Sequence, residues 1–333
     1  MKIVTKIIII SVITAVIFIG FLRISLTGKT QDKKQLIKIG IAAWVTNKEY
    51  TRNIQGFKDG LAKKGFIEGE NVMFFIETAE IDDTKQRKII QSFIDRDVDL
   101  IYSLTTPGTL IAKEMVADKP IVFSIVTYPV EAGVINALEN SGNNLVGTRN
   151  YVSVEQHYSQ FEKLCPTVKK IAIIHRKGEP NSKIQTREFS QLLAPKSIEV
   201  VEIAAVDIKD LRLQLKQVID DVDAIIATCD TLVQGGGEEI IIDFSLLYKK
   251  PSYTCNKDGV LKGALIGNIA DFYTIGELSG NKAALILQGA NPSSLLTESP
   301  AEGYLLVNTK TAKELRIKFP QYVLDQAQEI VSK

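Results

Sequence analysis

The stretch "DRDVDLIYSLTTPGT" at residues 95–109 returns in altered form as "IDDVDAIIATCDTLV" at residues 219–233. Each copy runs from an acidic turn through a short apolar run into hydroxyl-bearing or acidic residues. Two further pairs follow the same rule, namely "IKIGIAAW" from Ile37 with "KKIAIIH" from Lys169, and "DKPIVFSIV" at 118–126 with "KKPSYTCNK" at 249–257. Three pairs of similar segments occur in the same order and are separated by nearly the same number of residues, which predicts a single structural unit used twice.

Within each copy, short apolar runs alternate with longer stretches of helical period. "IKIGIAA" reads as a strand, and "TRNIQGFKDGLAKKGF" reads as an amphipathic helix that ends near Gly65. The apolar runs are nearly continuous, as expected of parallel strands that are buried on both faces. This alternation predicts an α/β fold with two doubly wound parallel-sheet lobes and a ligand cleft between them.

Ligands of open parallel sheets bind beyond the carboxyl ends of the strands. The predicted ends lie at 42–47, 103–109, 126–130, 175–182, 228–233 and 254–258.

Bulk composition excludes several functional classes. The 333 residues are 45% apolar, and 40 basic residues nearly balance 39 acidic ones. No basic stripe recurs along the chain, so we expect no nucleic-acid partner. With two histidines and three scattered cysteines, the spacing of a structural zinc site is missing, and we expect no metal and no cofactor.

The first thirty residues differ from the rest. Lys2 and Lys6 precede "IIIISVITAVIFIGFL" at 7–22, which is almost unbroken apolar sequence. A charged start followed by an apolar core is typical of an export signal. The cleavage pattern is poor, and the core with its flanks approaches the length of a membrane span. We expect residues 1–35 to be a signal or membrane anchor plus linker, either cleaved or kept as a tether.

Polar residues gather at matching strand ends of the two copies. Thr105 and Thr106 open one predicted helix, and Asn181 and Ser182 open another, while Asp230 stands in the second copy where the first has threonine. Helix starts favour anions, so two such starts and one carboxylate would suit a zwitterion. The alternative is simple capping, because these residue types are the preferred N-caps.

Two aromatic residues also fall at strand ends. Trp44, the single tryptophan, follows the first strand, where it would stack on a flat ligand or be partly buried at a lobe edge. Tyr128 ends another strand, in "VTYPV". The triple glycine of "VQGGGEEI" lacks the residues of a phosphate loop or a dinucleotide fingerprint, and no nucleophile elbow is present, so nucleotide binding is excluded and catalysis is not expected.

These segments resemble the substrate-binding component of ABC importers, in the branch that includes tryptophan- and tyrosine-type binders. The resemblance runs from about residue 37 to 318, and it is carried by "GFKDGLAKKGFIEGENV", "DLIYSLTTPGTLIAKE", "KPIVFSIVTYPVEAGVI", "NNLVGT", "GEPNSKIQ" and "LVNTKTAKELRI". It implies the type I periplasmic-binding-protein fold, with three crossovers between lobes that close on the ligand. Lobe 1 would comprise 36–150 and 267–292, and lobe 2 would comprise 151–266 and 293–333.

The resemblance also implies roles at the cleft. The "TTP" and "NS" segments would hold the carboxylate of the ligand, and Asp230 would lie near its amine. Asn268, in the returning segment, is expected at the same site. The chain departs from the family at Tyr128, where aspartate is frequent, and at Ala43-Trp44, and it lacks the lipid-anchor cysteine.

We therefore predict an extracytoplasmic solute-binding protein that captures a small carboxylate-bearing molecule, an aromatic amino acid above all. Its partners would be an ABC permease and ATPase, and the membrane through the N-terminal segment. The alternatives are a ligand-sensing ectodomain of the same fold and a two-lobed enzyme such as a glycosyltransferase. Whether Cys229 and Cys255 form a disulfide stays open, because the sequence does not give their distance.

Overall fold

The computed structural model describes residues 36–300 and 303–332. The predicted signal or anchor at 1–35 lies outside these residues. In the described part of the chain, no helix combines the length and the apolarity needed to span a bilayer.

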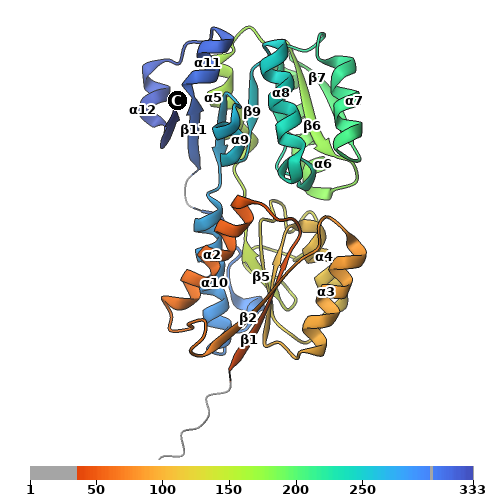
Figure 1. Cartoon of the computed structure of the whole chain (residues 1–333), viewed down its shortest axis with the longest axis vertical. Helices are drawn as coiled ribbons and strands as arrows, with labels where there is room; N and C mark the ends of the chain where they lie inside the picture. The colour runs from red at the N-terminus through yellow and green to blue at the C-terminus, as the bar shows by residue number, and fades with distance from the viewer. Residues whose placement is uncertain (1–35, 301–302, 333) are drawn as a thin grey trace, which may run out of the picture. The chain divides into compact units, whose positions relative to one another are not determined.

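The first lobe has a five-stranded parallel sheet in the order β2-β1-β3-β4-β5. Its strands are β1 (Ile37–Ala43), β2 (Val72–Thr78), β3 (Leu100–Leu104), β4 (Ile121–Ser124) and β5 (Leu145–Thr148). Its helices are α2 (Lys48–Ala62), α3 (Asp83–Asp95), α4 (Thr106–Met115), α10 (Phe272–Leu287) and the 3₁₀ turn η3 (Pro292–Ser294). Helices α3 and α4 cover one face of the sheet, and α2 and α10 cover the other (Figure 1).

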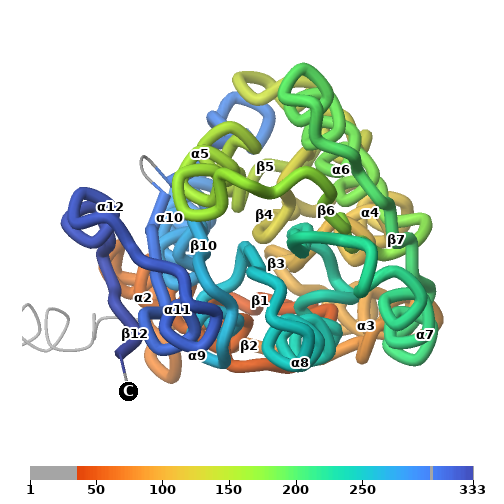
Figure 2. Tube along the Cα trace, turned by 90° about the horizontal axis from the view of Figure 1, so that it is seen from above, coloured from red at the N-terminus to blue at the C-terminus, as the bar shows by residue number. Residues whose placement is uncertain are grey.

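Helices α2 and α10 come from distant parts of the sequence and lie side by side (Figures 1 and 2). Glycines make this close approach possible. A Cβ atom on Gly56 would lie 2.1 Å from the Tyr273 carbonyl oxygen, and one on Gly276 would lie 2.0 Å from the Asn53 carbonyl oxygen. Any larger residue would push the helices apart, so this contact fixes α10 on the first lobe.

The second lobe has a seven-stranded sheet in the order β12-β11-β10-β9-β8-β6-β7. Its strands are β6 (Lys170–Arg176), β7 (Glu199–Ala205), β8 (Ala224–Ala227), β9 (Ser252–Thr254), β10 (Ile266–Ile269), β11 (Tyr304–Asn308) and β12 (Glu329–Val331). Its helices are α5 (Val154–Leu164), α6 (Pro180–Leu193), η1 (Ala194–Lys196), α7 (Ile208–Val218), the π-helix η2 (Val233–Gly237), α8 (Glu238–Tyr248), α9 (Lys257–Lys262), α11 (Thr309–Leu315) and α12 (Gln321–Gln326).

Both faces of the second sheet are buried, as the continuous apolar runs predicted. Along β6, Ile171 and Ile173 join one apolar cluster, and Ala172 and Ile174 join another on the opposite face. The prediction of two doubly wound α/β lobes is confirmed.

One strand pair departs from the expected parallel arrangement. Strand β11 runs antiparallel to β10. The chain leaves β10 toward the first lobe, builds α10 and η3 there, and re-enters the second sheet from the same end. A strand that enters where its neighbour left must run in the opposite direction.

The lobe boundaries differ slightly from the expected 267–292. Strand β10, at Ile266–Ile269, belongs to the second sheet, so the segment of the first lobe begins after it. At the other end, Glu298 forms a bridge with Thr148 of the first sheet. The returning segment therefore starts and ends a few residues later than the sequence indicated.

Candidate functional site

The start of α4 places two threonine hydroxyls at the carboxyl end of β3. Thr105 has φ 73° and ψ 160°, a region that only glycine adopts readily, and such strain costs about 1–3 kcal/mol. Thr105 and Thr106 are buried, α4 has no side-chain cap, and neither hydroxyl has a hydrogen-bond partner among the described residues. Strain combined with unpartnered buried hydroxyls marks this helix start as a candidate for ligand binding.

The start of α6 lies in the second lobe and also lacks a side-chain cap. The Asn181 Nδ2 group donates to the Cys229 carbonyl oxygen at 3.1 Å, which leaves the buried Oδ1 atom without a donor in the described part of the chain. The free atom of Asn181 is thus an acceptor, and it does not suit the carboxylate that the sequence assigned to it. The Ser182 hydroxyl faces the carbonyl oxygens of Arg176 and Glu179, at 3.2 and 3.1 Å, so its proton is used within its own turn.

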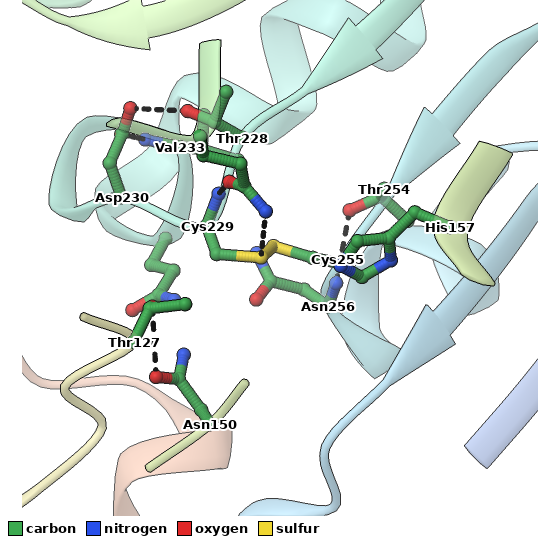
Figure 3. The surroundings of a disulfide bond; sticks show 12 residues. Thr127, Asn150, His157, Thr228, Cys229, Asp230, Val233, Thr254, Cys255 and Asn256 are labelled. Atoms are coloured by element: carbon green, nitrogen blue, oxygen red, sulfur yellow. Dashed lines mark hydrogen bonds between the residues drawn. A yellow bond between two sulfur atoms is a disulfide. The ribbon is translucent and has the colours of Figure 1, made fainter. Parts of the chain in front are cut away.

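Asp230 is a cap, not an open carboxylate. Its oxygens accept hydrogen bonds from the amides of Arg176, Leu232 and Val233 and from the Thr228 hydroxyl, at 2.6 to 2.9 Å. Figure 3 shows Thr228 and Val233 beside Asp230. Burial raises the pKa of Asp230, while the Val233 and Arg176 amides oppose the rise. A carboxylate offers about four acceptor positions, and all four are taken. The predicted pairing of Asp230 with a ligand amine is therefore not supported.

The two aromatic residues are buried. Trp44 directly follows β1, whereas β4 ends at Ser124, so Tyr128 lies in the loop after it and does not end a strand as predicted. Trp44 packs against the first turn of α4, since a Cβ on Gly108 would lie 3.4 Å from its Cε3 atom, and its Nε1–H has no acceptor among the described residues. The Tyr128 hydroxyl donates to Glu188 Oε2 in the second lobe at 2.5 Å. Burial and that carboxylate raise the pKa of Tyr128. Tyr128 is thus an interlobe contact.

Asn268 lies on β10 in the second sheet. Its backbone N–H donates to the Tyr253 hydroxyl at 3.1 Å. A Cβ on Gly303 would lie 2.3 Å from the Asn268 Oδ1 atom, so the carboxamide packs against the start of β11. That oxygen is also without a donor in the described part of the chain.

A contact that the sequence did not predict also joins the two lobes. The Tyr50 hydroxyl, on α2, donates to Gln234 Oε1 at 2.8 Å, and Asn47 Nδ2 donates to the Gln234 carbonyl oxygen at 3.0 Å. Gln234 belongs to the π-helix η2, inside the triple-glycine motif that matched no nucleotide loop. A cavity of about 220 Å³ between the lobes is lined in part by these three residues.

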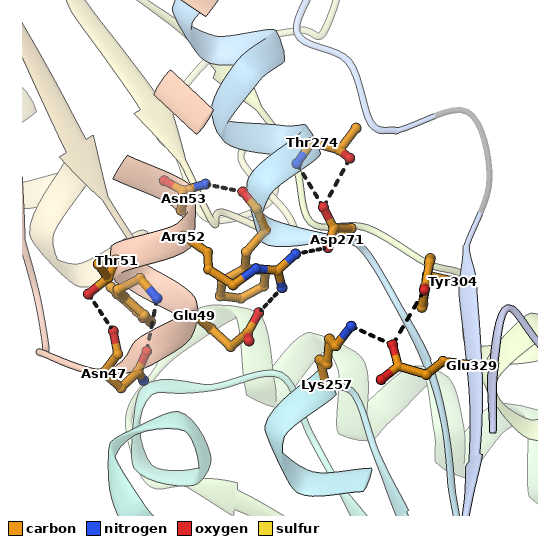
Figure 4. A network of polar contacts seen from close by, with 12 residues as sticks. Asn47, Glu49, Thr51, Arg52, Asn53, Lys257, Asp271, Thr274, Tyr304 and Glu329 are labelled. Atoms are coloured by element: carbon orange, nitrogen blue, oxygen red, sulfur yellow. Dashed lines mark hydrogen bonds and ion pairs between the residues drawn. The ribbon is translucent and has the colours of Figure 1, made fainter. Parts of the chain in front are cut away.

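Arg52 secures the crossover that leads from β10 to α10. Its guanidinium forms salt bridges with Glu49, in the first turn of α2, at 2.9 Å and with Asp271, the N-cap of α10, at 2.8 Å (Figure 4). The start of α2, which carries the interlobe contact, is therefore tied to the crossover.

Cys229 and Cys255 form a disulfide, with a Cα–Cα distance of 5.7 Å (Figure 3). They follow the neighbouring strands β8 and β9. The Cys229 N–H also donates to Gln185 Oε1 at 2.9 Å. The disulfide thus fixes the position of the Cys229 carbonyl oxygen, which accepts the hydrogen bond from Asn181 Nδ2.

Several predicted site residues carry buried polar atoms that have no hydrogen-bond partner in the described part of the chain. Within residues 36–300 and 303–332, five of the eight predicted residues carry such an atom, namely Trp44, Thr105, Thr106, Asn181 and Asn268. Sequence reasoning missed Gln86, whose buried Oε1 is likewise unpartnered among the described residues. Helix periodicity gives no signal for it, because a buried glutamine in the first turn of α3 looks like an ordinary surface position. In the described ranges, no group of three His, Cys, Asp or Glu side chains is arranged to hold a metal ion.

Comparison with known proteins assigns the family. Residues 38–331 match the family model of the ABC transporter substrate binding protein. The chain belongs to this family. Its members are solute-binding proteins of ABC transporters, not enzymes.

Among similar proteins, a tyrosine-binding protein from Clostridioides difficile is 29% identical over 287 residues, which cover 86% of this chain and 83% of that protein. A Streptococcus pneumoniae ABC domain solved in complex with L-Trp has a TM-score of 0.85 and 24% identity, over 89% of this chain and 100% of that one. A ligand-free, open substrate-binding protein with adhesive properties from Clostridium difficile has a TM-score of 0.70 and 26% identity, over 90% and 100%.

Proposed function

We propose that this substrate-binding protein captures an aromatic amino acid, of the tyrosine or tryptophan type, outside the cytoplasm and delivers it to an ABC permease and ATPase for import. The proposal rests first on the buried polar atoms that have no hydrogen-bond partner among the described residues and that lie at or near strand ends in both lobes. Buried polar groups are almost always hydrogen-bonded, so a cluster without partners indicates groups reserved for a ligand. The names of the tyrosine-binding and L-Trp-bound similar proteins support the class of ligand.

The first lobe supplies the donors that a carboxylate needs. The hydroxyls of Thr105 and Thr106 stand at the uncapped start of α4, where the helix dipole favours negative charge. By contrast, α2, α3 and α10 in the same lobe are each capped by the side chain of their N-cap residue. The Trp44 Nε1–H group is a third donor in this lobe that has no acceptor among the described residues. We assign the carboxylate of the ligand to this helix start.

Closure of the lobes would exclude water from these groups. The Tyr50–Gln234 and Tyr128–Glu188 hydrogen bonds join the two lobes at two separate places. Each polar contact to the ligand gains strength when water is displaced, and the closed form is what a permease would recognise. Export by the segment at 7–22, with or without tethering, is part of the same proposal and concerns residues outside the described ranges.

Calorimetric titration with L-tyrosine, L-tryptophan, L-phenylalanine, L-leucine and L-arabinose tests the proposed function. We expect saturable binding of the aromatic amino acids and none of the sugar. Thr106→Val should weaken that binding by about 1.5–3 kcal/mol, since it removes a donor to a charged group. Thr84→Val is the matched control, because Thr84 is exposed in the first turn of α3. If the parent binds no amino acid, or if Thr106→Val binds as tightly as the parent, the proposed function or its site is wrong.

A further inference from the structure

Glu179 is a buried carboxylate with one oxygen left open. It is the N-cap residue of α6, yet its side chain does not cap that helix. Instead, Oε2 accepts hydrogen bonds from Thr231, at 2.6 Å from the hydroxyl and 3.2 Å from the amide. The residue is only 5% exposed, and Oε1 accepts no hydrogen bond from the described residues.

The charges around Glu179 do not balance it. Asp230, in the loop after β8, repels it, and Tyr50 of α2 lies near both carboxylates. The single cation nearby among the described residues is Arg176, whose Nη1 donates to the Thr231 hydroxyl at 2.9 Å and so reaches Glu179 indirectly. Burial first and Asp230 second raise the pKa of Glu179 to about 7. A buried carboxylate under these conditions is stabilised by a cation that supplies hydrogen-bond donors.

A second acceptor lies two residues further along the same turn. Asn181 is 5% exposed, and its Oδ1 atom has no donor in the described part of the chain. The identity of that atom is settled, because the other amide position faces the Cys229 carbonyl oxygen and must be the nitrogen. The start of α6 thus offers two open acceptors, whereas the start of α4 offers open donors. This polarity matches a zwitterion with its ammonium group toward the second lobe.

We infer that Glu179 Oε1, assisted by Asn181 Oδ1, binds the ammonium group of the amino-acid ligand. This inference rests on the proposed function, since it needs an amino acid in the interlobe site. The predicted partner of the ammonium group is thereby changed from Asp230, whose acceptor positions are filled, to Glu179, whose Oε1 atom accepts no hydrogen bond from the described residues. Asp230 then acts on the ligand only through its repulsion of Glu179.

Two ligands and two variants test the assignment. The ligands are L-tyrosine and 3-(4-hydroxyphenyl)propionate, which differ only in the amino group. Against the parent we expect tyrosine to bind at least about thirtyfold tighter than the propionate. In Glu179→Gln the preference should shrink to less than about fivefold. Glu155→Gln, an exposed acid in the first turn of α5, should keep the preference of the parent.

The pH profile separates ligand pairing from a merely structural role. Protonation of Glu179 removes its charge, so the Kd of the parent for tyrosine should rise as pH falls below about 7, by up to about tenfold per unit. The propionate should show no such rise, and Glu179→Gln should flatten the tyrosine profile. If circular dichroism shows that Glu179→Gln does not fold, the pH dependence of Kd is compared for tyrosine and the propionate in the parent and in Glu179→Asp. Because Glu179→Asp keeps the charge, it should keep the difference between the two ligands.

An unchanged preference for tyrosine in Glu179→Gln, or equal pH profiles for the two ligands, would overturn the inference and leave the proposed function standing. If the parent binds neither ligand, the proposed function itself fails.

Discussion

Replacement of Asp230 by alanine should destabilise the fold rather than abolish one ligand contact. Four donors converge on this carboxylate, three of them backbone amides. The fourth, the Thr228 hydroxyl, has a second acceptor in the Ile174 carbonyl oxygen at 3.0 Å. In Asp230→Ala three amides therefore lose their acceptor, and each buried unsatisfied donor costs about 1–3 kcal/mol.

Loss of the charge also relieves its repulsion of Glu179, which offsets part of that cost and lowers the pKa of Glu179. We expect a net loss of about 3 kcal/mol in the free energy of unfolding. Asp230→Asn keeps one carbonyl oxygen for the start of η2 and should cost about half as much.

Urea unfolding followed by circular dichroism measures this loss. With a slope of about 3 kcal/mol per molar, a loss of 3 kcal/mol lowers the midpoint by about 1 M. Suppose Asp230→Ala unfolds at the same urea concentration as the parent but no longer binds the amino acid. Then Asp230 is a ligand group after all, and its assignment as a cap is wrong.

Three further predictions concern the lobes and the core. Tyr50→Phe removes an interlobe hydrogen bond, so ligand dissociation measured by stopped-flow fluorescence of the single tryptophan should accelerate up to about tenfold; an unchanged rate would show that this contact does not hold the closed form. Replacement of both Cys229 and Cys255 by alanine opens a loop with a sequence separation of 26 and should cost about 3.5 kcal/mol, which denaturation of the parent with and without reductant should reproduce. Burial raises the pKa of Glu238 to about 8, so the stability contributed by its protonated form is complete below pH 4.5 and is lost as pH rises toward 8. The thermal midpoint of the parent should therefore fall over this pH range, and Glu238→Gln should remove that fall. Identical pH profiles for the parent and Glu238→Gln would contradict this prediction.

The sequence predicted the architecture well because strand burial leaves a direct pattern. "IKIGIAA" coincides with β1, and "KKIAIIH" at 169–175 begins and ends one residue before β6 at Lys170–Arg176. Hydrophobic periodicity could not show that β11 runs antiparallel, because direction depends on where the chain re-enters the sheet.

The site was predicted less completely, for a physical reason. Asp, Asn and Ser suit both a helix cap and a ligand, and the choice depends on which atom meets which neighbour in three dimensions. Asp230 and Ser182 form hydrogen bonds within their own turns, whereas the hydroxyls of Thr105 and Thr106 have no partner in the part of the chain that the structure describes. The disulfide needed a distance that the sequence does not contain.

The central claim is that the facing helix starts of the two lobes hold an amino acid by its two charged ends. A crystal structure of the protein with L-tyrosine tests it most directly. We predict the carboxylate within hydrogen-bond distance of the Thr105 and Thr106 hydroxyls at the start of α4, and the ammonium group beside Glu179 and Asn181. An amino acid seated elsewhere, or bound with these two ends exchanged, would contradict the account.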